Sequence, residues 1–149
     1  MNTRIGQPDA EDAKITQRTQ KEQPNQEDDF SHEIIGAAVE VQRILGVGLL
    51  ESAYAGALAI ELAERELGFQ REVPISAMYK SHDLGVVYRA DFIVEGSVIV
   101  EVKATDAIAD VHRAQLLSCL RLSGLKLGLL INFHTFPVFK GIHRLVNRL

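Results

Sequence analysis

The chain has 149 residues, 46% of them apolar, and a formal net charge of −4, as expected for one ordinary globular domain. Its single cysteine, Cys119, excludes a disulfide framework and any thiolate-rich zinc or iron–sulfur site, and it favours a reducing, cytoplasmic location. The polar first thirty residues lack the apolar segment of a signal peptide, and no apolar run reaches the roughly 18 residues that span a membrane, so we expect no membrane partner.

Residues 1–29 are rich in Gln, Asp, Glu, Asn and Thr and carry a net charge of −3. This composition predicts a disordered acidic and polar tail, followed by one domain over residues 30–149. The domain opens with two predicted helices. Ser31 is a good N-cap for the first, which ends at Gly46, and Gly68 is the predicted C-cap of the second.

A strand is predicted over residues 69–79, where Pro74 favours an edge position or a bulge. After a turn at residues 80–83, a hairpin follows, with strands over residues 86–94 and 98–102 that are rich in β-branched side chains. The remaining elements are a helix over 107–122 closed by Gly124, a buried strand over 127–133, and a strand or strand-plus-turn over 138–146 interrupted by Gly141. The order α-α-β-β-β-α-β-β indicates an α/β sheet flanked by helices.

Three charged residues of the hairpin are expected to share one face. If residues 95–97 form the loop, Val94 pairs with Val98, and the ladder then brings Asp91 directly opposite Glu101. Opposed residues of an antiparallel pair have Cβ atoms about 5 Å apart. Lys103 follows Glu101 by two residues and therefore points to the same side.

Two crowded carboxylates are costly unless a positive charge lies between them, and a divalent cation meets that need. Mg²⁺ prefers one or two protein carboxylates with water and phosphate oxygens, so Asp91 and Glu101 are candidate ligands, with the carbonyl of Val102 as a further one. Lys103 would hold a phosphate or orient water. The alternative is a solvated salt-bridge cluster, although a strand that is apolar on both faces is a poor place for one.

Residues 111–149 contain no acidic side chain and carry a charge of +6, which favours a surface that faces phosphates. These charges could instead be scattered over several faces. The segment holds few aromatic residues placed for base stacking, so no reading of bases is expected. One hypothesis is that the acidic tail shields this surface. The candidate nucleic-acid contacts are Arg113, Arg121, Lys140 and Arg144.

Asp91 and the Glu101-Val102-Lys103 triplet resemble the acid and the E-x-K element of the PD-(D/E)XK nuclease superfamily, whose core order is αβββαβ. More narrowly, the segment 48–54 (GLLESAY) is similar to the signature of the GxxExxY proteins. Further likenesses to that family are YRAD at 88–91, EVKA at 101–104, HRAQLL at 112–117 and GLLINF at 128–133. The resemblance runs from about residue 32 to the C-terminus.

The resemblance implies a restriction-endonuclease-like core with an extra N-terminal helix. It also implies a RecB-like site in which Glu51 and Gln115 join Asp91, Glu101 and Lys103, with Glu51 as a further metal ligand. Glu51 could instead complement the dipole of its helix, and Gln115 could be an ordinary exposed residue. The family usually has Tyr at the position of Cys119, so a role for an aromatic hydroxyl at that position is not expected in this chain.

The expected function is a Mg²⁺- or Mn²⁺-dependent nuclease that cleaves phosphodiester bonds, with DNA as the favoured partner. The alternative is a catalytically weak or inactive module on a nuclease fold that binds nucleic acid or a protein. The sequence leaves the oligomeric state open, a homodimer included.

Overall fold

The computed structural model describes residues 30–148, which form one unit from Ser31 onward, and the predicted tail lies outside the described residues. The helices are α2 (Ser31–Leu45), α3 (Glu51–Glu64) and α4 (Asp110–Ser123); the strands are β1 (Phe69–Tyr79), β2 (His82–Val94), β3 (Val98–Lys103), β4 (Leu127–Asn132) and β5 (Ile142–Val146); and a short 3₁₀ helix, η1 (Val138–Gly141), precedes β5. This is the predicted order of elements. No helix in the described part is long and apolar enough to cross a membrane.

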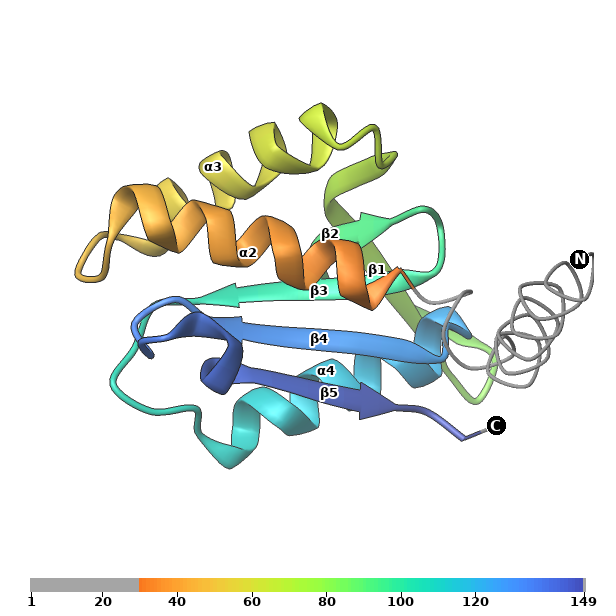
Figure 1. The fold of residues 1–149 in the computed structure, drawn as a ribbon. Coiled ribbons are helices and arrows are strands. Elements are labelled where there is room, and N and C mark those ends of the chain that lie inside the picture. The colour runs from red at the N-terminus through yellow and green to blue at the C-terminus, as the bar shows by residue number, and fades with distance from the viewer. Residues whose placement is uncertain (1–29, 149) are drawn as a thin grey trace, which may run out of the picture. The chain divides into compact units, whose positions relative to one another are not determined.

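The strands form one mixed five-stranded sheet in the order β1-β2-β3-β4-β5 (Figure 1). β3 and β4 pair in parallel, with α4 between them in the chain, whereas the other three pairs are antiparallel. A parallel pair requires such a crossover, because the chain has to return to the end of the sheet at which β3 started. β1 lies at an edge, as Pro74 predicted.

Helices cover both faces of the sheet, with α2 and α3 on one side and α4 on the other (Figure 1). Leu116 and Leu120 of α4 pack with Ile99 and Leu130 in the core on its side. On the opposite side the ring of Tyr54 stacks on that of Phe133, with centroids 4.8 Å apart. Since each buried side chain of this size contributes roughly 1.5–3 kcal/mol, these two cores hold the central strands between layers.

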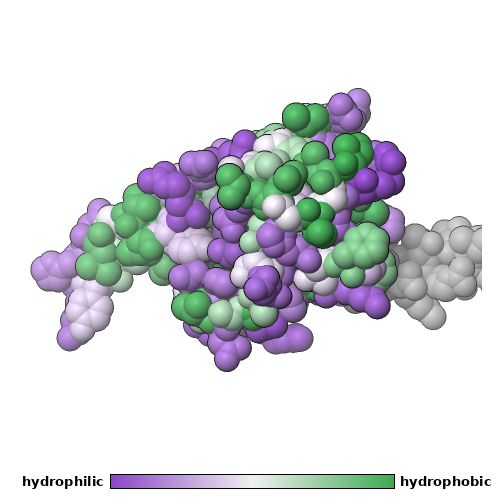
Figure 2. Space-filling model, turned by 90° about the vertical axis from the view of Figure 1, so that its left-hand side faces the viewer, coloured by the Kyte–Doolittle hydropathy of each residue, from purple (hydrophilic) through white to green (hydrophobic). Residues whose placement is uncertain are grey.

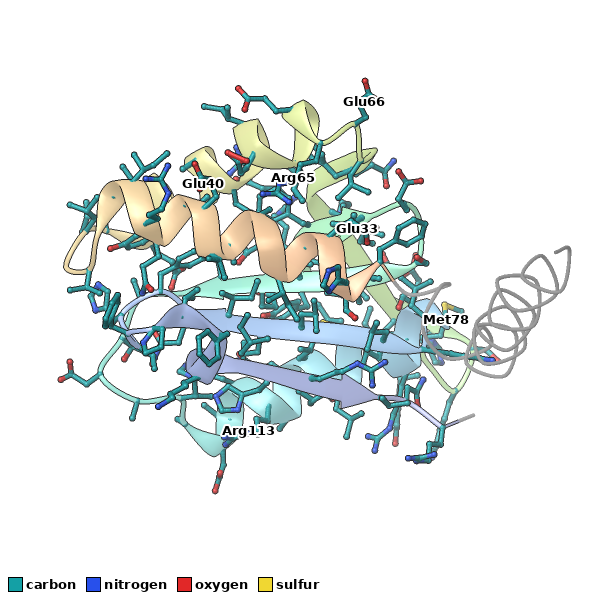
Figure 3. The ribbon with its side chains drawn as sticks, in the orientation of Figure 1. Glu33, Glu40, Arg65, Glu66, Met78 and Arg113 are labelled. Carbon is teal, nitrogen blue, oxygen red and sulfur yellow. The ribbon has the colours of Figure 1, made fainter. Side chains whose placement is uncertain are left out.

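The Tyr54 hydroxyl also fixes the connection between α2 and α3. It donates to the carbonyl of Gly46 at 2.7 Å and accepts the N–H of Leu49 at 3.2 Å. At the other end of the helix pair, Arg65 points toward α2 and Glu40 (Figure 3) and donates to the carbonyl of Gly36 at 3.3 Å. Both ends of α3 are therefore tied to α2 or to the loop that follows it.

The predicted end of α3 at Gly68 is wrong. The helix ends at Glu64, and Glu66 takes the left-handed conformation (φ 62°) that glycine usually occupies there. The N–H of Glu66 bonds to the carbonyl of Ala63, and the N–H of Leu67 bonds to that of Leu62. This pair of bonds is a Schellman motif, which closes the helix without a glycine.

The predicted start of the second strand at residue 86 is also wrong, because β2 begins at His82. Tyr79 pairs directly with His82, so the turn contains only Lys80 and Ser81, with φ values of 49° and 73°. Two consecutive left-handed residues match the twist of a two-residue hairpin. β1 and β2 therefore form a longer hairpin than expected.

Smaller differences occur near the C-terminus. α4 begins at Asp110 instead of residue 107, and Gly124 (φ 77°) caps it as predicted. The segment over 138–146 divides at Gly141 into η1 and β5. A Cβ atom at Gly141 would lie 2.6 Å from Cβ of Thr135 and 2.7 Å from the carbonyl oxygen of Asn132, so no larger residue fits there.

Candidate active site

The backbone pairing of β2 with β3 gives way to side-chain bonding at Asp91 and Glu101. The Val94–Val98 pairing and the three-residue loop are as predicted, and the register continues to Phe92 and Val100. Beyond that pair, the N–H of Val102 donates to Oδ2 of Asp91 at 2.8 Å, and the N–H of Asp91 donates to Oε2 of Glu101 at 3.2 Å. Each carboxylate thus bonds to the backbone of the facing strand, which holds the two acids together.

The Glu101 carboxyl is buried, with only 2% of the residue exposed. Burial first, and then the nearby charge of Asp91, raise its pKa to about 8. The backbone bond from Asp91, the charge of Lys103 and the hydroxyl of Tyr88 act in the opposite direction. The site therefore favours either a proton on Glu101 or an additional positive charge beside it.

Lys103 lies at the end of β3, two residues beyond Glu101 and half-buried. It forms no ion pair with any of residues 30–148. Its charge is near enough to Glu101 to lower the pKa of that carboxyl. The ammonium is thus held beside the acidic pair without being neutralised by one direct partner.

Tyr88 belongs to the site and was not predicted as a site residue. Its hydroxyl donates to Oε1 of Glu101 at 3.2 Å. Burial, followed by the charge of Glu101, raises the pKa of Tyr88, so its hydroxyl stays protonated and remains a donor. The available signal was its place three residues before Asp91 in the YRAD segment, although the contact itself needs the fold.

A pocket of about 190 Å³ opens between the start of α3 and the β1–β2 pair. Glu51, the first residue of α3, and Asp91 both line it. Arg71 and Glu72 of β1 also line it and were not expected there. The guanidinium of Arg71 lies 5.2 Å from the centre of the Phe92 ring, which supports the cation at the edge of this pocket.

Gln115 lines a different pocket, of about 270 Å³, on the α4 side, together with Tyr88 and Cys119. The Cys119 thiol is buried there, and its pKa is raised to about 12 by burial and by the charge of Glu101, so the thiol is not a nucleophile. Because Glu51 and Gln115 line different pockets, they are not neighbours. The hydrogen-bonded series Tyr88–Glu101–Asp91 extends from one pocket to the other.

The described residues contain no group of three or more His, Cys, Asp or Glu side chains that could hold a metal ion. The carboxylates of Asp91 and Glu101 remain as a pair, and this fits a hard dication that keeps water and phosphate oxygens in its shell. Glu51 lies across the pocket from Asp91 and does not complete a three-residue group. Val102 uses its N–H toward Asp91, which leaves its carbonyl as the candidate ligand.

The four predicted nucleic-acid contacts lie on three elements: Arg113 and Arg121 on α4, Lys140 in η1 and Arg144 on β5. Arg113 contacts Asp110 at 3.5 Å and the Nδ1 atom of His143 at 3.4 Å, and it lies on the α4 side of the sheet (Figure 3). Arg144, next to His143, points to the other face by the alternation of a strand. They are thus distributed over both faces and do not form one patch.

Comparison with protein-family models gives a match to the PD-(D/E)XK nuclease superfamily over residues 28–145. Comparisons with curated proteins and with solved structures gave no significant match. The elements α3-β1-β2-β3-α4-β4 reproduce the αβββαβ core, with α2 as the extra N-terminal helix. The narrower likeness to the GxxExxY proteins stays a prediction. The chain, with an acidic pair shared between β2 and β3 and a lysine at the end of β3, therefore belongs to the PD-(D/E)XK nuclease superfamily.

Proposed function

We propose that this protein is a metal-dependent nuclease that hydrolyses phosphodiester bonds of nucleic acid, with DNA as the favoured substrate. The observation that carries the proposal is the buried Glu101 carboxyl, raised in pKa beside Asp91 and within the influence of Lys103. A purely structural salt bridge with Lys103 would need only one acid, whereas both Asp91 and Glu101 are present. A buried carboxylate beside a second, partly exposed one is costly and suits a site that receives a cation.

Asp91 and Glu101 are the proposed ligands of Mg²⁺ or Mn²⁺, assisted by the carbonyl of Val102. When bound, such an ion lowers the pKa of a coordinated water and neutralises charge on the phosphate. Tyr88 orients the Glu101 carboxyl through its hydroxyl. The backbone amides of Asp91 and Val102 fix both acids, so little reorganisation is needed when substrate arrives.

Lys103 is the proposed phosphate-binding residue. Its ammonium has no ion-pair partner among the described residues and can therefore face a phosphate oxygen or the attacking water. In hydrolysis the water oxygen bonds to phosphorus and one P–O ester bond breaks. Arg71, at the edge of the pocket that contains Asp91, is a second cation for the same phosphate or its neighbour.

Glu51 and Gln115 have supporting roles in this proposal. Glu51 shares the pocket with Asp91 and would be a further ligand of the ion. Gln115 lies beside Tyr88 on the α4 side and would hold a substrate phosphate there. Arg113, Arg121, Lys140 and Arg144 would contact more distant phosphates, each independently of the others.

The test is cleavage of end-labelled single- and double-stranded DNA and RNA by the full chain with Mg²⁺, Mn²⁺ or EDTA. We expect metal-dependent cleavage that falls by about 100-fold or more in Lys103→Ala, the usual scale for losing a residue that stabilises transition-state charge. Lys126→Ala is the matched control. Lys103 pairs with Asn132 at the end of β4, whereas Lys126 lies just before the start of that strand, away from the site. Equal cleavage by both variants would refute the assignment, and no cleavage on any substrate would favour the binding module.

A further inference from the structure

An aromatic side chain projects into solvent at the end of the sheet where the central strands β3 and β4 terminate. Phe136, in the loop after β4, is 78% exposed, and Phe139 in η1 is 56% exposed. Figure 2 views the molecule from this side of Figure 1, and hydrophobic side chains gather there among polar ones. Covering a phenyl ring this exposed would remove apolar surface from water, which is favourable.

The loop that carries Phe136 is held by one buried side chain from α2. Nε2 of Gln42 donates to the carbonyls of Phe133 at 2.9 Å and Thr135 at 2.8 Å. Oε1 of Gln42 accepts the N–H of Val138 at 2.8 Å. The backbone is therefore fixed on both sides of the exposed ring, which presents the ring in a defined place instead of on a mobile loop.

The same loop starts beside the candidate catalytic lysine. The N–H of Phe133 donates to the carbonyl of Lys103 at 2.8 Å, and Asn132 pairs with Lys103 across the parallel strands. Oδ1 of Asn132 also accepts the N–H of Thr105, which joins the two loops that leave this edge. Phe136 follows Phe133 by three residues, a chain span of at most about 10 Å.

The loop that carries the ring holds basic and no acidic side chains, since His134 lies two residues before Phe136 and Lys140 four residues after it. No acidic residue occurs from residue 111 onward, and Lys140 lies one residue after Phe139. Exposed aromatic rings beside cations are the composition of surfaces that bind single strands, in which bases stack on the rings and cations follow the phosphates. Bases inside a duplex do not offer a free face to a side chain, whereas unpaired bases do.

We propose that Phe136 stacks on an unpaired nucleobase next to the phosphate held by Lys103, so that the substrate is single-stranded or frayed DNA. This inference rests on the proposed nuclease function and revises the expectation that the chain has no stacking surface. Gln42 holds the backbone on both sides of Phe136, and the loop begins at the Lys103 carbonyl, so a base stacked on the ring would limit which phosphate reaches the lysine.

The chain contains no tryptophan, so Phe136→Trp introduces a single fluorescent reporter. We expect its emission to be quenched in a saturable way by a single-stranded 12-nucleotide DNA in EDTA, and not by a blunt hairpin duplex of equal concentration. The control is Tyr79→Trp at the tip of the β1–β2 hairpin, 59% exposed, whose emission should not change. Absence of quenching at position 136, or equal quenching by the duplex, would overturn the proposal and leave this face to a protein partner.

Affinity gives a second, independent measurement. Phe136→Ala should weaken binding of the single strand by about 5- to 150-fold, the range for losing one base–aromatic stack. Unchanged affinity would refute stacking even if the protein cleaves DNA. Conversely, quenching of the Phe136→Trp variant without cleavage by any metal-loaded protein would preserve the stacking proposal and refute the nuclease, so the two failures are distinguishable.

Discussion

Replacing Glu101 by glutamine should stabilise the metal-free protein at alkaline pH. The pKa of this carboxyl is about 8 in the fold against 4.5 ordinarily. Between these values the folded protein keeps a proton that the unfolded chain has released, so the free energy of unfolding decreases as the pH rises and has lost this contribution above pH 8. Moving a pKa over this interval corresponds to roughly 5 kcal/mol, at 1.36 kcal/mol per unit.

Glutamine removes the titration while preserving the contacts. Its amide oxygen can accept the N–H of Asp91, and its NH₂ group can donate to the hydroxyl of Tyr88, the two partners of Glu101. We expect the free energy of unfolding of Glu101→Gln to exceed that of the wild type by about 2–5 kcal/mol at pH 8, and by less than about 1 kcal/mol at pH 4.5.

Urea unfolding followed by circular dichroism in EDTA, at both pH values, measures this difference. Glu64→Gln, which changes an exposed glutamate of α3, is the control and should behave like the wild type. Addition of Mg²⁺ at pH 8 should stabilise the wild type more than Glu101→Gln, because the variant keeps only one of the two proposed carboxylate ligands. A wild type as stable as the variant at pH 8 would show that Glu101 is not destabilised by its surroundings and would refute the reasoning.

Three further outcomes are expected. Gln42→Leu should lower the free energy of unfolding by about 3 kcal/mol or more, because two buried backbone groups and one partly buried carbonyl lose their partner. An unchanged urea midpoint would contradict this. Glu66→Gly should raise the free energy of unfolding by about 1 kcal/mol, since Glu66 is left-handed (φ 62°). Glu64→Gly, at the last residue of the helix, should lower the free energy of unfolding by a similar amount. Equal effects of the two changes in the same urea assay would refute the Schellman motif. Tyr88→Phe should reduce metal-dependent cleavage about tenfold with little change in unfolding, and a loss below about twofold would remove Tyr88 from the site.

Local sequence was sufficient for the hairpin that carries the acids. A three-residue loop permits one pairing of Val94 with Val98, and the register then follows as far as Phe92 and Val100. Counting predicted Asp91 opposite Glu101; the paired register ends one step earlier, at Phe92 and Val100, and side-chain bonds join the two acids beyond it. What counting did not reveal is that the acids accept backbone N–H groups at this point, because that requires the strands to separate.

Element ends were less predictable, since glycine is only a frequent occupant of left-handed positions. Gly68 is the C-cap that the sequence predicts, but Glu66 takes the left-handed conformation. Lys80 and Ser81 do the same in a turn without any glycine. Contacts across the fold were not predictable at all. Gln42 and Phe133 are 91 residues apart in the chain, and no local pattern links them.

The amides that hold Asp91 and Glu101 also make the site a reporter of its own occupancy. The N–H of Val102 and the N–H of Asp91 bond to oxygens that a bound cation would attract. These two protons should therefore exchange with solvent deuterium at a different rate once an ion binds, while the neighbouring N–H groups of the intact ladder stay unchanged. Occupancy could then be followed residue by residue, without substrate and without turnover.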